Sequence, residues 1–328
     1  MRNYIIKRIL LSILILFCST FIIYTVLRCL PTSYVENMAM QLSAKPGSKP
    51  YQEWLDQLNA SYGMDKNIVS GYFTWVSKAI VGNFGDSWRF TKPVTAVFTE
   101  CIGYSFVMAA IALVLELIIA IPLGILAATK QYSRLDYAVT AGALVGISLP
   151  TFFFATVIKM IFSVGLRWFD IGGIVGKNYG QLDRMGQLLD MGHHMVLPIL
   201  TLTIVSVGGL MRYTRTNMLE ELNTDYIRTA RAKGLSEHKV IYHHAFRNTL
   251  IPLVTMVGGS LPGLFSGALI TETLFSIPGI GYISYQAMTT GDIPFSMFYM
   301  TFVAILTLAG NLITDILYAV VDPRVRYT

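Results

Sequence analysis

Several ionisable residues lie inside long apolar stretches of this sequence, and their side chains could take part in chemistry. Glu116, Glu272 and Asp315 carry carboxyl groups there, and Lys159 carries an amine. A charged group within a membrane-crossing helix is costly unless it is paired or solvated, so such residues mark either a solute pathway or a hydrogen bond between helices. Both interpretations stay open for the three carboxyl groups. The long stem of Lys159 favours an ammonium group that reaches a membrane interface.

Two histidine pairs form the second chemically capable group. His193 and His194 are flanked by methionines, a composition that suits a port for a metal ion. We recognise no carboxylate at metal-ligand spacing from this pair, so we expect the two histidines to be structural and predict no metal site. The other pair, His243 and His244, is expected to contact solvent or a partner protein.

The elements that hold these residues are helices in a lipid environment. Of the 328 residues, 54% are hydrophobic and 13% are charged, and the mean hydropathy is positive, whereas soluble globular proteins carry about a quarter charged residues. Six apolar stretches are each long enough to cross a bilayer as a helix, which also satisfies its own backbone hydrogen bonds. They cover residues 9–30, 104–128, 138–166, 195–213, 251–274 and 297–321. The sequence therefore predicts an all-α, polytopic membrane helical bundle with six transmembrane helices.

Basic residues beside these stretches indicate the orientation, because Lys and Arg are retained on the cytoplasmic side of a membrane. With the N-terminus inside, 14 of the 25 Lys and Arg residues lie in the cytoplasm, and so do both termini. The net charge of +6 does not indicate a nucleic-acid partner, because the basic residues are scattered without an aromatic-interleaved patch.

Three regions follow from this arrangement. They are the N-terminus with the first helix over residues 1–30, an extracytoplasmic loop over 31–103, and a five-helix core over 104–328.

The extracytoplasmic loop is too long to be a simple connector, so we expect it to form a small cap. Residues 52–62 and 67–80 each mix apolar and polar types. In the second segment Tyr72, Val76 and Ala79 recur at helical spacing, which predicts a short amphipathic helix at the outer interface.

A charged cytoplasmic segment, residues 219–249, is the most informative part of the core. The residues from Asp225 onward have a helical composition that is interrupted at Gly234, which suits a left-handed helix C-cap. Ser236 can then begin a second helix.

One face of this first cytoplasmic helix could bind a partner. Ile227, Ala230 and Arg231 recur on that face and form a small and basic surface suited to docking in a partner's groove. The alternative is a solvated loop with a capping glycine.

The same segment carries a resemblance to a known family. The run Tyr-Ile-Arg-Thr-Ala-Arg-Ala-Lys-Gly-Leu at residues 226–235 resembles the coupling segment of binding-protein-dependent ABC permeases, and specifically of the oligopeptide/dipeptide branch. Further motifs similar to that branch occur in order along nearly the whole chain. They include Tyr-Gly-Met-Asp at 62–65, Gly-Asn-Phe-Gly-Asp-Ser at 82–87, Ile-Ser-Leu-Pro at 147–150, Glu-Thr-Leu-Phe-Ser-Ile-Pro-Gly-Ile-Gly at 272–281 and Asp-Pro-Arg at 322–324. The chain resembles the first of the two permease subunits of such an importer.

This resemblance implies the type I ABC importer architecture and a set of partners in a bacterial cytoplasmic membrane. The implied partners are a second homologous permease, two cytoplasmic ATPases that hold ATP and Mg²⁺, and an extracytoplasmic substrate-binding protein or lipoprotein. In agreement, the sequence contains no Gly-x4-Gly-Lys-Ser/Thr phosphate loop. The chain itself is then expected to be non-catalytic and to hold no cofactor.

The resemblance also implies that residues 225–247 couple the permease to its ATPases. Closure of the ATPases around ATP would move the short helix as a lever and switch the pathway between inward-facing and outward-facing states. The residues expected to contact the ATPase are Tyr226, Ala230, Arg231, Ala232, Lys233, Gly234 and Leu235. The implied substrates are oligopeptides or dipeptides, with nickel chelates, haem, glutathione and glycosides as alternatives.

Two other classes of function remain open. A secondary transporter or channel would need no ATPase, and it would use intramembrane charges for ion coupling, of which this chain has few. A receptor or scaffold subunit would signal that the binding protein is occupied without moving solute.

Overall fold

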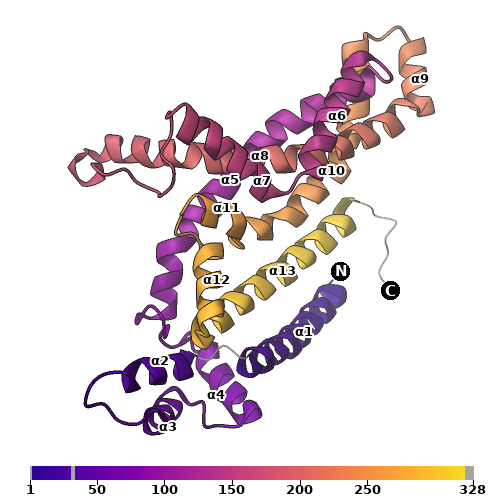
Figure 1. The fold of residues 1–328 in the computed structure, drawn as a ribbon. Helices are drawn as coiled ribbons and strands as arrows, with labels where there is room; N and C mark the ends of the chain where they lie inside the picture. The colour runs from indigo at the N-terminus through magenta and orange to yellow at the C-terminus, as the bar shows by residue number, and fades with distance from the viewer. Residues whose placement is uncertain (1, 31–33, 322–328) are drawn as a thin grey trace. The chain divides into compact units, whose positions relative to one another are not determined.

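The computed structural model describes residues 2–30 and 34–321, and side chains at 6–30, 34–260 and 262–313. Within these ranges every regular element is helical, apart from one isolated bridge between Asp86 and Pro93. The chain divides into two compact units (Figure 1). The prediction of an all-α fold is confirmed.

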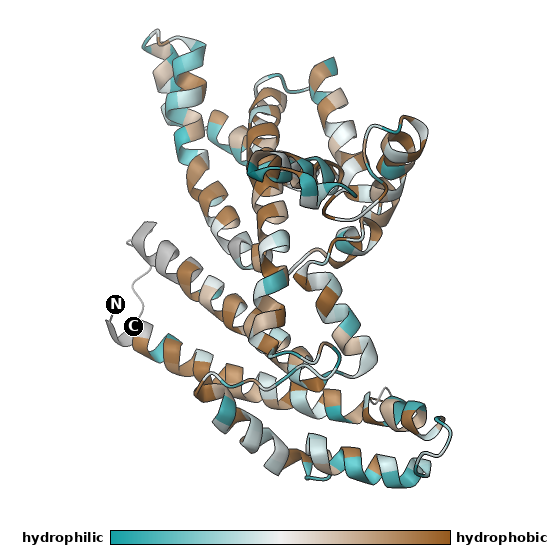
Figure 2. Cartoon of the chain, turned by 90° about the vertical axis from the view of Figure 1, so that its left-hand side faces the viewer, coloured by the Kyte–Doolittle hydropathy of each residue, from teal (hydrophilic) through white to brown (hydrophobic). Residues whose placement is uncertain are grey.

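Five helical stretches are long and apolar enough to cross a membrane. They are Ile6–Ser43, Val94–Thr129, Arg184–Leu222, Lys239–Phe265 and Ile293–Ile313. Figure 2 shows hydrophobic residues along most of the length of the long helices, with hydrophilic residues at several helix ends and in the connecting turns. A sixth span is reached only if a bent pair of helices counts as one.

That bent pair corrects the expectation of one continuous helix over residues 138–166. Helix α6 (Arg134–Ser148) and helix α7 (Thr151–Lys159) with η1 (Met160–Gly165) meet at an angle of 101°. Pro150 causes the break, because its ring disfavours helical geometry in the preceding residue and it has no N–H to donate. Leu149 accordingly has extended backbone angles, φ −93° and ψ 137°.

The stretch expected to be one helix over 251–274 is also broken. Helix α10 (Phe246–Ser260) passes into the 3₁₀-helix η4 (Leu261–Phe265), and helix α11 (Leu269–Leu274) follows. Gly267, between η4 and α11, has a φ of +79°, which an L side chain rarely adopts. The sequence showed apolar residues here, but the break depends on this backbone turn.

Unit 1 comprises Met1–Gly103 with Ile280–Leu312. Its helices are α1 (Arg2–Cys29), α2 (Tyr34–Ser43), α3 (Tyr51–Tyr62), α4 (Ile68–Ile80) and α12 (Ile280–Thr290), together with α5 (Val94–Thr129) up to Gly103 and α13 (Ile293–Val321) up to Leu312. The short helix expected within residues 67–80 is confirmed as α4, whereas the sequence did not predict α2.

Helix α4 forms where the pattern of its apolar residues predicts it. The side chain of Asn67 caps its N-terminus by accepting a hydrogen bond from the Ser70 amide at 2.7 Å. Tyr72 is 1% exposed, packs with Tyr24 of α1, and donates its hydroxyl proton to the carbonyl of Phe17 at 2.9 Å. The helix is therefore held on α1.

The loop over 31–103 is not a separate body within unit 1. Val97 and Cys101 of α5 pack with Ile280 and Phe295 of α12 and α13 in one buried cluster. Asp292 ties the same parts together, because its carboxylate accepts the hydroxyl of Ser87 and the amide of Arg89. The regions drawn from the sequence at 1–30, 31–103 and 104–328 thus differ from the two compact units.

Unit 2 comprises Tyr104–Gly279 and Ile313–Arg326. Besides α5 from Tyr104 onward, its elements include α6, α7, η1, η2 (Tyr179–Gln181), α8 (Arg184–Leu222), α9 (Asp225–Ala232), η3 (Lys239–Ala245), α10, η4 and α11. The long helix α8 packs against α6, α7 and α10. This helix therefore organises the unit.

Close packing of α6 on α8 depends on Gly208. A Cβ atom added there would lie 2.5 Å from the carbonyl oxygen of Ala143, a backbone atom that cannot rotate away. We expect Gly208→Ala to lower the free energy of unfolding of the detergent-solubilised protein by about 1–3 kcal/mol, the usual cost of overpacking. Thermal unfolding would measure it.

The adjacent glycine supplies the control for this prediction. A Cβ atom at Gly209 would meet nothing within 4 Å, so Gly209→Ala should leave the melting temperature unchanged or raise it. Equal destabilisation by both substitutions would contradict the role of Gly208 in close packing.

Candidate functional site

The candidate site is built around α9, which lies at one end of unit 2 beside the ends of α8 and α10 (Figure 1). Helix α8 ends at Leu222, and Thr224 takes extended backbone angles, φ −74° and ψ 155°, immediately before α9. Asp225 stands in the first turn, where a carboxylate interacts favourably with the helix dipole.

The end of α9 agrees with the glycine signal in the sequence. Gly234 has a φ of +77°, and its amide donates to the carbonyl of Arg231 at 2.9 Å, while the amide of Leu235 donates to Ala230. The predicted left-handed turn at Gly234 is confirmed. The next helical residues begin at Glu237, directly after Ser236.

One side of α9 is buried in this chain's own core. Ile227 is 0% exposed and Ala230 is 7% exposed, and both pack in a cluster with Met218 of α8 and Val240 of η3. The face expected to dock into a partner through Ile227, Ala230 and Arg231 is therefore divided. Ile227 and Ala230 fasten α9 to its own subunit, and Arg231 remains exposed.

The other side of α9 and the turn after it are open to a partner. Of the seven residues expected to contact an ATPase, Ala230 is buried and Leu235 is half-buried against the Ile227 cluster. The exposed ones are Tyr226, Arg231, Ala232, Lys233 and Gly234.

Polar contacts brace this exposed surface from both ends. Arg231 forms a two-pronged ion pair with Glu237, with Nε to Oε1 at 2.9 Å and Nη2 to Oε2 at 3.3 Å. The hydroxyl of Tyr226 donates to Glu221 and accepts from Nδ2 of Asn248 at 2.8 Å. Burial, together with the hydrogen bond to Glu221, raises the pKa of Tyr226, so this hydroxyl stays protonated as a donor. Tyr226 thereby links α8, α9 and α10.

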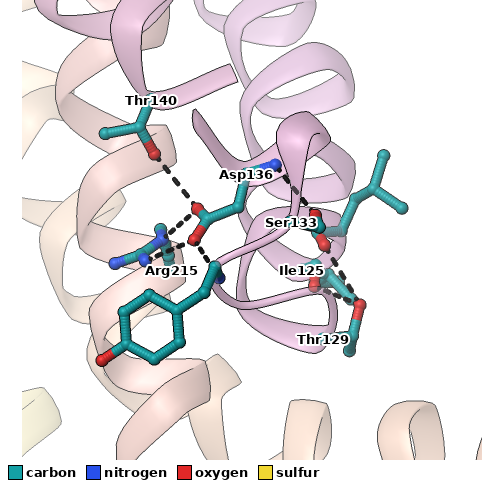
Figure 3. Close-up of polar contacts among 8 residues, drawn as sticks. Ile125, Thr129, Ser133, Asp136, Thr140 and Arg215 are labelled. Atoms are coloured by element: carbon teal, nitrogen blue, oxygen red, sulfur yellow. Dashed lines mark hydrogen bonds and ion pairs between the residues drawn. The ribbon is translucent and has the colours of Figure 1, made fainter. Parts of the chain in front are cut away.

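A largely buried ion pair holds α6 to α8 next to this site, as Figure 3 shows. The carboxylate of Asp136 receives Nε and Nη2 of Arg215, both at 2.8 Å, and also the hydroxyl of Thr140 at 3.2 Å. The Asp136 side chain is 4% exposed and that of Arg215 is 23% exposed. The pair fixes α8 close to the point where α8 leads into α9.

A family model described as the binding-protein-dependent transport system inner membrane component matches residues 120–327. A second model, of the N-terminal part of such membrane components, matches residues 1–125. The chain belongs to this family.

Relatives of this membrane component cover it from end to end. The oligopeptide transport system permease protein AppB of Bacillus subtilis is 34% identical over 328 residues, which is 100% of both chains. The di/tripeptide transport system permease protein DppB of Pseudomonas aeruginosa is 32% identical over 340 residues, covering 100% of this chain and 99% of the relative. Multi-pass insertion in the membrane follows from the family and from the apolar helices.

A solved structure of the inward-facing MetNI methionine ABC transporter shares the fold. Its matching chain aligns with a TM-score of 0.51 at 16% identity, over 68% of the present membrane component and 97% of that chain. The expected ABC importer permease architecture is confirmed at the level of the fold.

The intramembrane carboxyl groups of this membrane component lie in different surroundings. Glu272 of α11 is 0% exposed and accepts the hydroxyl of Ser105 at 2.7 Å and the amide of Ala268 at 3.0 Å. Glu116 of α5 is half-buried, so both interpretations stay open for it. The contact of Glu272 with Ser105 fits the interpretation as a hydrogen bond between helices. Asp315 falls on α13, but its side chain lies outside the described residues.

The ammonium group of Lys159 is bound within unit 2. Its ammonium group donates to the carbonyl of Leu274 at 2.6 Å and lies over the ring of Phe275 at 5.7 Å. The residue therefore connects the end of α7 to the end of α11.

Several residues of this site were missed from the sequence. Asp136 follows Ser133 at the spacing of a helix N-terminus, which marks the start of α6 but gives no hint of Arg215. Asn248 stands in a segment already identified, yet its bond to Tyr226 depends on the return of the chain through η3.

Asp170 is the remaining missed residue. It lies in the loop after η1, and its carboxylate and the rings of His193 and His194 bring their ligand atoms within 4.8 Å of one another. The premise that no carboxylate is available to this histidine pair is therefore wrong.

Proposed function

We propose that this chain is the permease subunit of an ATP-driven importer of peptides, and that it forms the translocation pathway with a second homologous permease. The family, whose members depend on a binding protein, supports a partnership with an extracytoplasmic substrate-binding protein or lipoprotein. Oligopeptides and dipeptides are the substrates that the names of the full-length relatives indicate.

The coupling role is supported mainly by the difference between the two sides of α9. Its apolar side is buried through Ile227 and Ala230, whereas its basic side and the turn at Gly234 are exposed. A helix fastened in this way transmits a push on its outer side to α8 and α10, because packed cores do not deform smoothly. Tyr226, Arg231, Ala232, Lys233 and Gly234 are the proposed contacts with the ATPase.

The proposed orientation puts α9 and both termini in the cytoplasm. The basic residues around α9, among them Arg228, Arg231 and Lys233, support this assignment, because Lys and Arg are retained on the inner side. The N-terminal end of α8 and the loop after η1 then face the extracytoplasmic side.

The chemistry of ATP belongs to the partner subunits in this proposal. ATP and Mg²⁺ are held by the two ATPases, and this chain contributes movement and a pathway. Glu116 and Asp315 are the remaining pathway candidates, and Glu272 serves as a hydrogen-bonded link between α11 and α5.

Reconstitution in vesicles tests the function. Vesicles that contain both permeases, both ATPases and the binding protein should accumulate a labelled peptide when ATP is supplied on the cytoplasmic side. Removal of the ATPases should abolish uptake. Uptake that needs only an ion gradient would instead identify a secondary transporter, and ATP hydrolysis stimulated by peptide without accumulation would identify a signalling subunit.

A further inference from the structure

The strongest unexplained cluster in unit 2 is Asp170, His193 and His194. His193 and His194 are neighbours on α8, and Asp170 comes from the loop that follows η1. Oδ2 of Asp170 lies 3.2 Å from Nε2 of His194. The described residues contain one group of three or more His, Cys, Asp or Glu side chains with ligand atoms this close, and it is this one.

The contacts of His194 decide which of its nitrogens can bind a cation. The side chain is 2% exposed, and its Nδ1 lies 2.8 Å from the carbonyl oxygen of Asp190, which can only accept a hydrogen bond. Nδ1 therefore carries the proton. In the neutral ring Nε2 is then an acceptor, and it faces the carboxylate of Asp170, which is also an acceptor. Two acceptors at this distance repel each other unless a positive charge lies between them.

A proton or a metal ion could supply that positive charge, and the nearby imidazole of His193 favours the metal ion. A proton would satisfy His194 and Asp170 alone, whereas His193 adds a further imidazole within 4.8 Å. A histidine that binds a metal usually donates its other N–H to a carbonyl or carboxylate, as His194 does to Asp190.

The surroundings hold the other two groups in place. The ring of His193 stacks on Phe169 with centroids 4.6 Å apart, and the hydroxyl of Ser163 donates to the carbonyl of Asp170 at 3.1 Å. Arg167 has a φ of +56°, an uncommon value outside glycine, at the point where the chain turns into this loop. The loop is also tied to α8 where the amide of Gly176 donates to Asp190 at 2.7 Å.

We propose that Asp170, His193 and His194 bind a divalent transition-metal ion of the zinc class, which fastens the loop after η1 to the N-terminal part of α8. Imidazole ligands select zinc, nickel or cobalt over magnesium and calcium. Four-coordinate zinc places its ligand atoms about 3.4 Å apart, and Oδ2 of Asp170 already lies 3.2 Å from Nε2 of His194. This inference does not depend on the transport role.

Metal binding to the full-length chain in detergent tests the proposal directly. The protein is freed of metal with a chelator and titrated with Co²⁺, whose visible absorption reports its ligands, and Zn²⁺ is then added as competitor. We expect one equivalent of each ion per chain. Asp170→Asn and His193→Gln, both at exposed positions, should each weaken Co²⁺ binding by at least about tenfold.

The matched control is His243→Gln, which removes an exposed imidazole from the other histidine pair. It should bind Co²⁺ as the unaltered protein does. All variants should melt at the same temperature with chelator present, which separates loss of a ligand from misfolding.

A second readout follows the loop itself. Zn²⁺ should slow tryptic cleavage after the exposed Lys177 in the unaltered chain but not in Asp170→Asn. Absence of a stoichiometric Co²⁺ spectrum would overturn the proposal and leave a protonated His194 paired with Asp170. Binding that the Asp170 and His193 variants do not weaken would overturn it as well.

Discussion

Replacing Gly234 with valine is expected to reduce ATP-dependent peptide uptake about tenfold or more, since ~1.4 kcal/mol changes an equilibrium tenfold. The expected loss comes from the backbone conformation at Gly234 and not from a steric clash with neighbouring atoms. Gly234 has a φ of +77°, while a Cβ atom there would meet nothing within 4 Å. A β-branched residue in this left-handed conformation costs roughly 1–2 kcal/mol or more, so the turn after α9 should open and displace the proposed ATPase contacts.

The measurement is uptake by vesicles that contain the complete importer, together with the amount of ATPase that copurifies with the permease. Gly234→Asn is the matched control, because asparagine adopts the left-handed conformation more readily than other non-glycine residues. It should retain most of the uptake. Normal uptake in Gly234→Val would show that force does not enter through this turn.

Removing the carboxylate of Asp136 is expected to cause a large loss of stability in unit 2. In Asp136→Ala the guanidinium group of Arg215 keeps its partly buried position, with a side chain 23% exposed, but loses the bidentate partner at 2.8 Å. Breaking such a pair on one side typically costs about 3–5 kcal/mol, because a charge is left in a poorly solvated place. Since whole domains are stable by about 5–15 kcal/mol, thermal unfolding in detergent should show a large shift.

A double substitution separates this pair from simple packing. Asp136→Ala combined with Arg215→Met removes both charges, so it should recover most of the loss caused by Asp136→Ala alone. The control for a surface pair is Glu100→Gln. Its partner Lys92 lies at 2.8 Å, but both side chains are more than half exposed, so the change should stay within about 1 kcal/mol. If the double variant were no more stable than Asp136→Ala, the ion pair would not be the cause.

Patterns local in the chain were predictable from the residues. The apolar stretches predicted membrane helices, because a single segment in lipid satisfies its backbone hydrogen bonds by forming a helix. The spacing of Tyr72, Val76 and Ala79 predicted α4, and Gly234 predicted the left-handed turn after α9. In each case the signal and the structure lie within a few residues of one another.

Expectations that required knowledge of a distant partner were less successful. The face of α9 with Ile227 and Ala230 has the composition of a docking surface, and the sequence cannot say whether it docks on another protein or on Met218 and Val240 of the same chain. The sequence likewise gives no hint that the ammonium group of Lys159 donates to the carbonyl of Leu274.

The sequence by itself determined that this protein is an all-helical membrane component, and where its exposed basic turn falls, because hydrophobic length, charge and glycine conformation act locally. Only the tertiary structure decided that Asp136 meets Arg215, that Glu272 meets Ser105, and that Asp170 reaches the histidine pair. Those contacts join residues that the chain brings together by bending at Pro150, at Gly267 and after η1. Each bend changes the direction of the helix that follows it. The contacts that result therefore join residues far apart in the sequence, and the residues beside each bend do not reveal them.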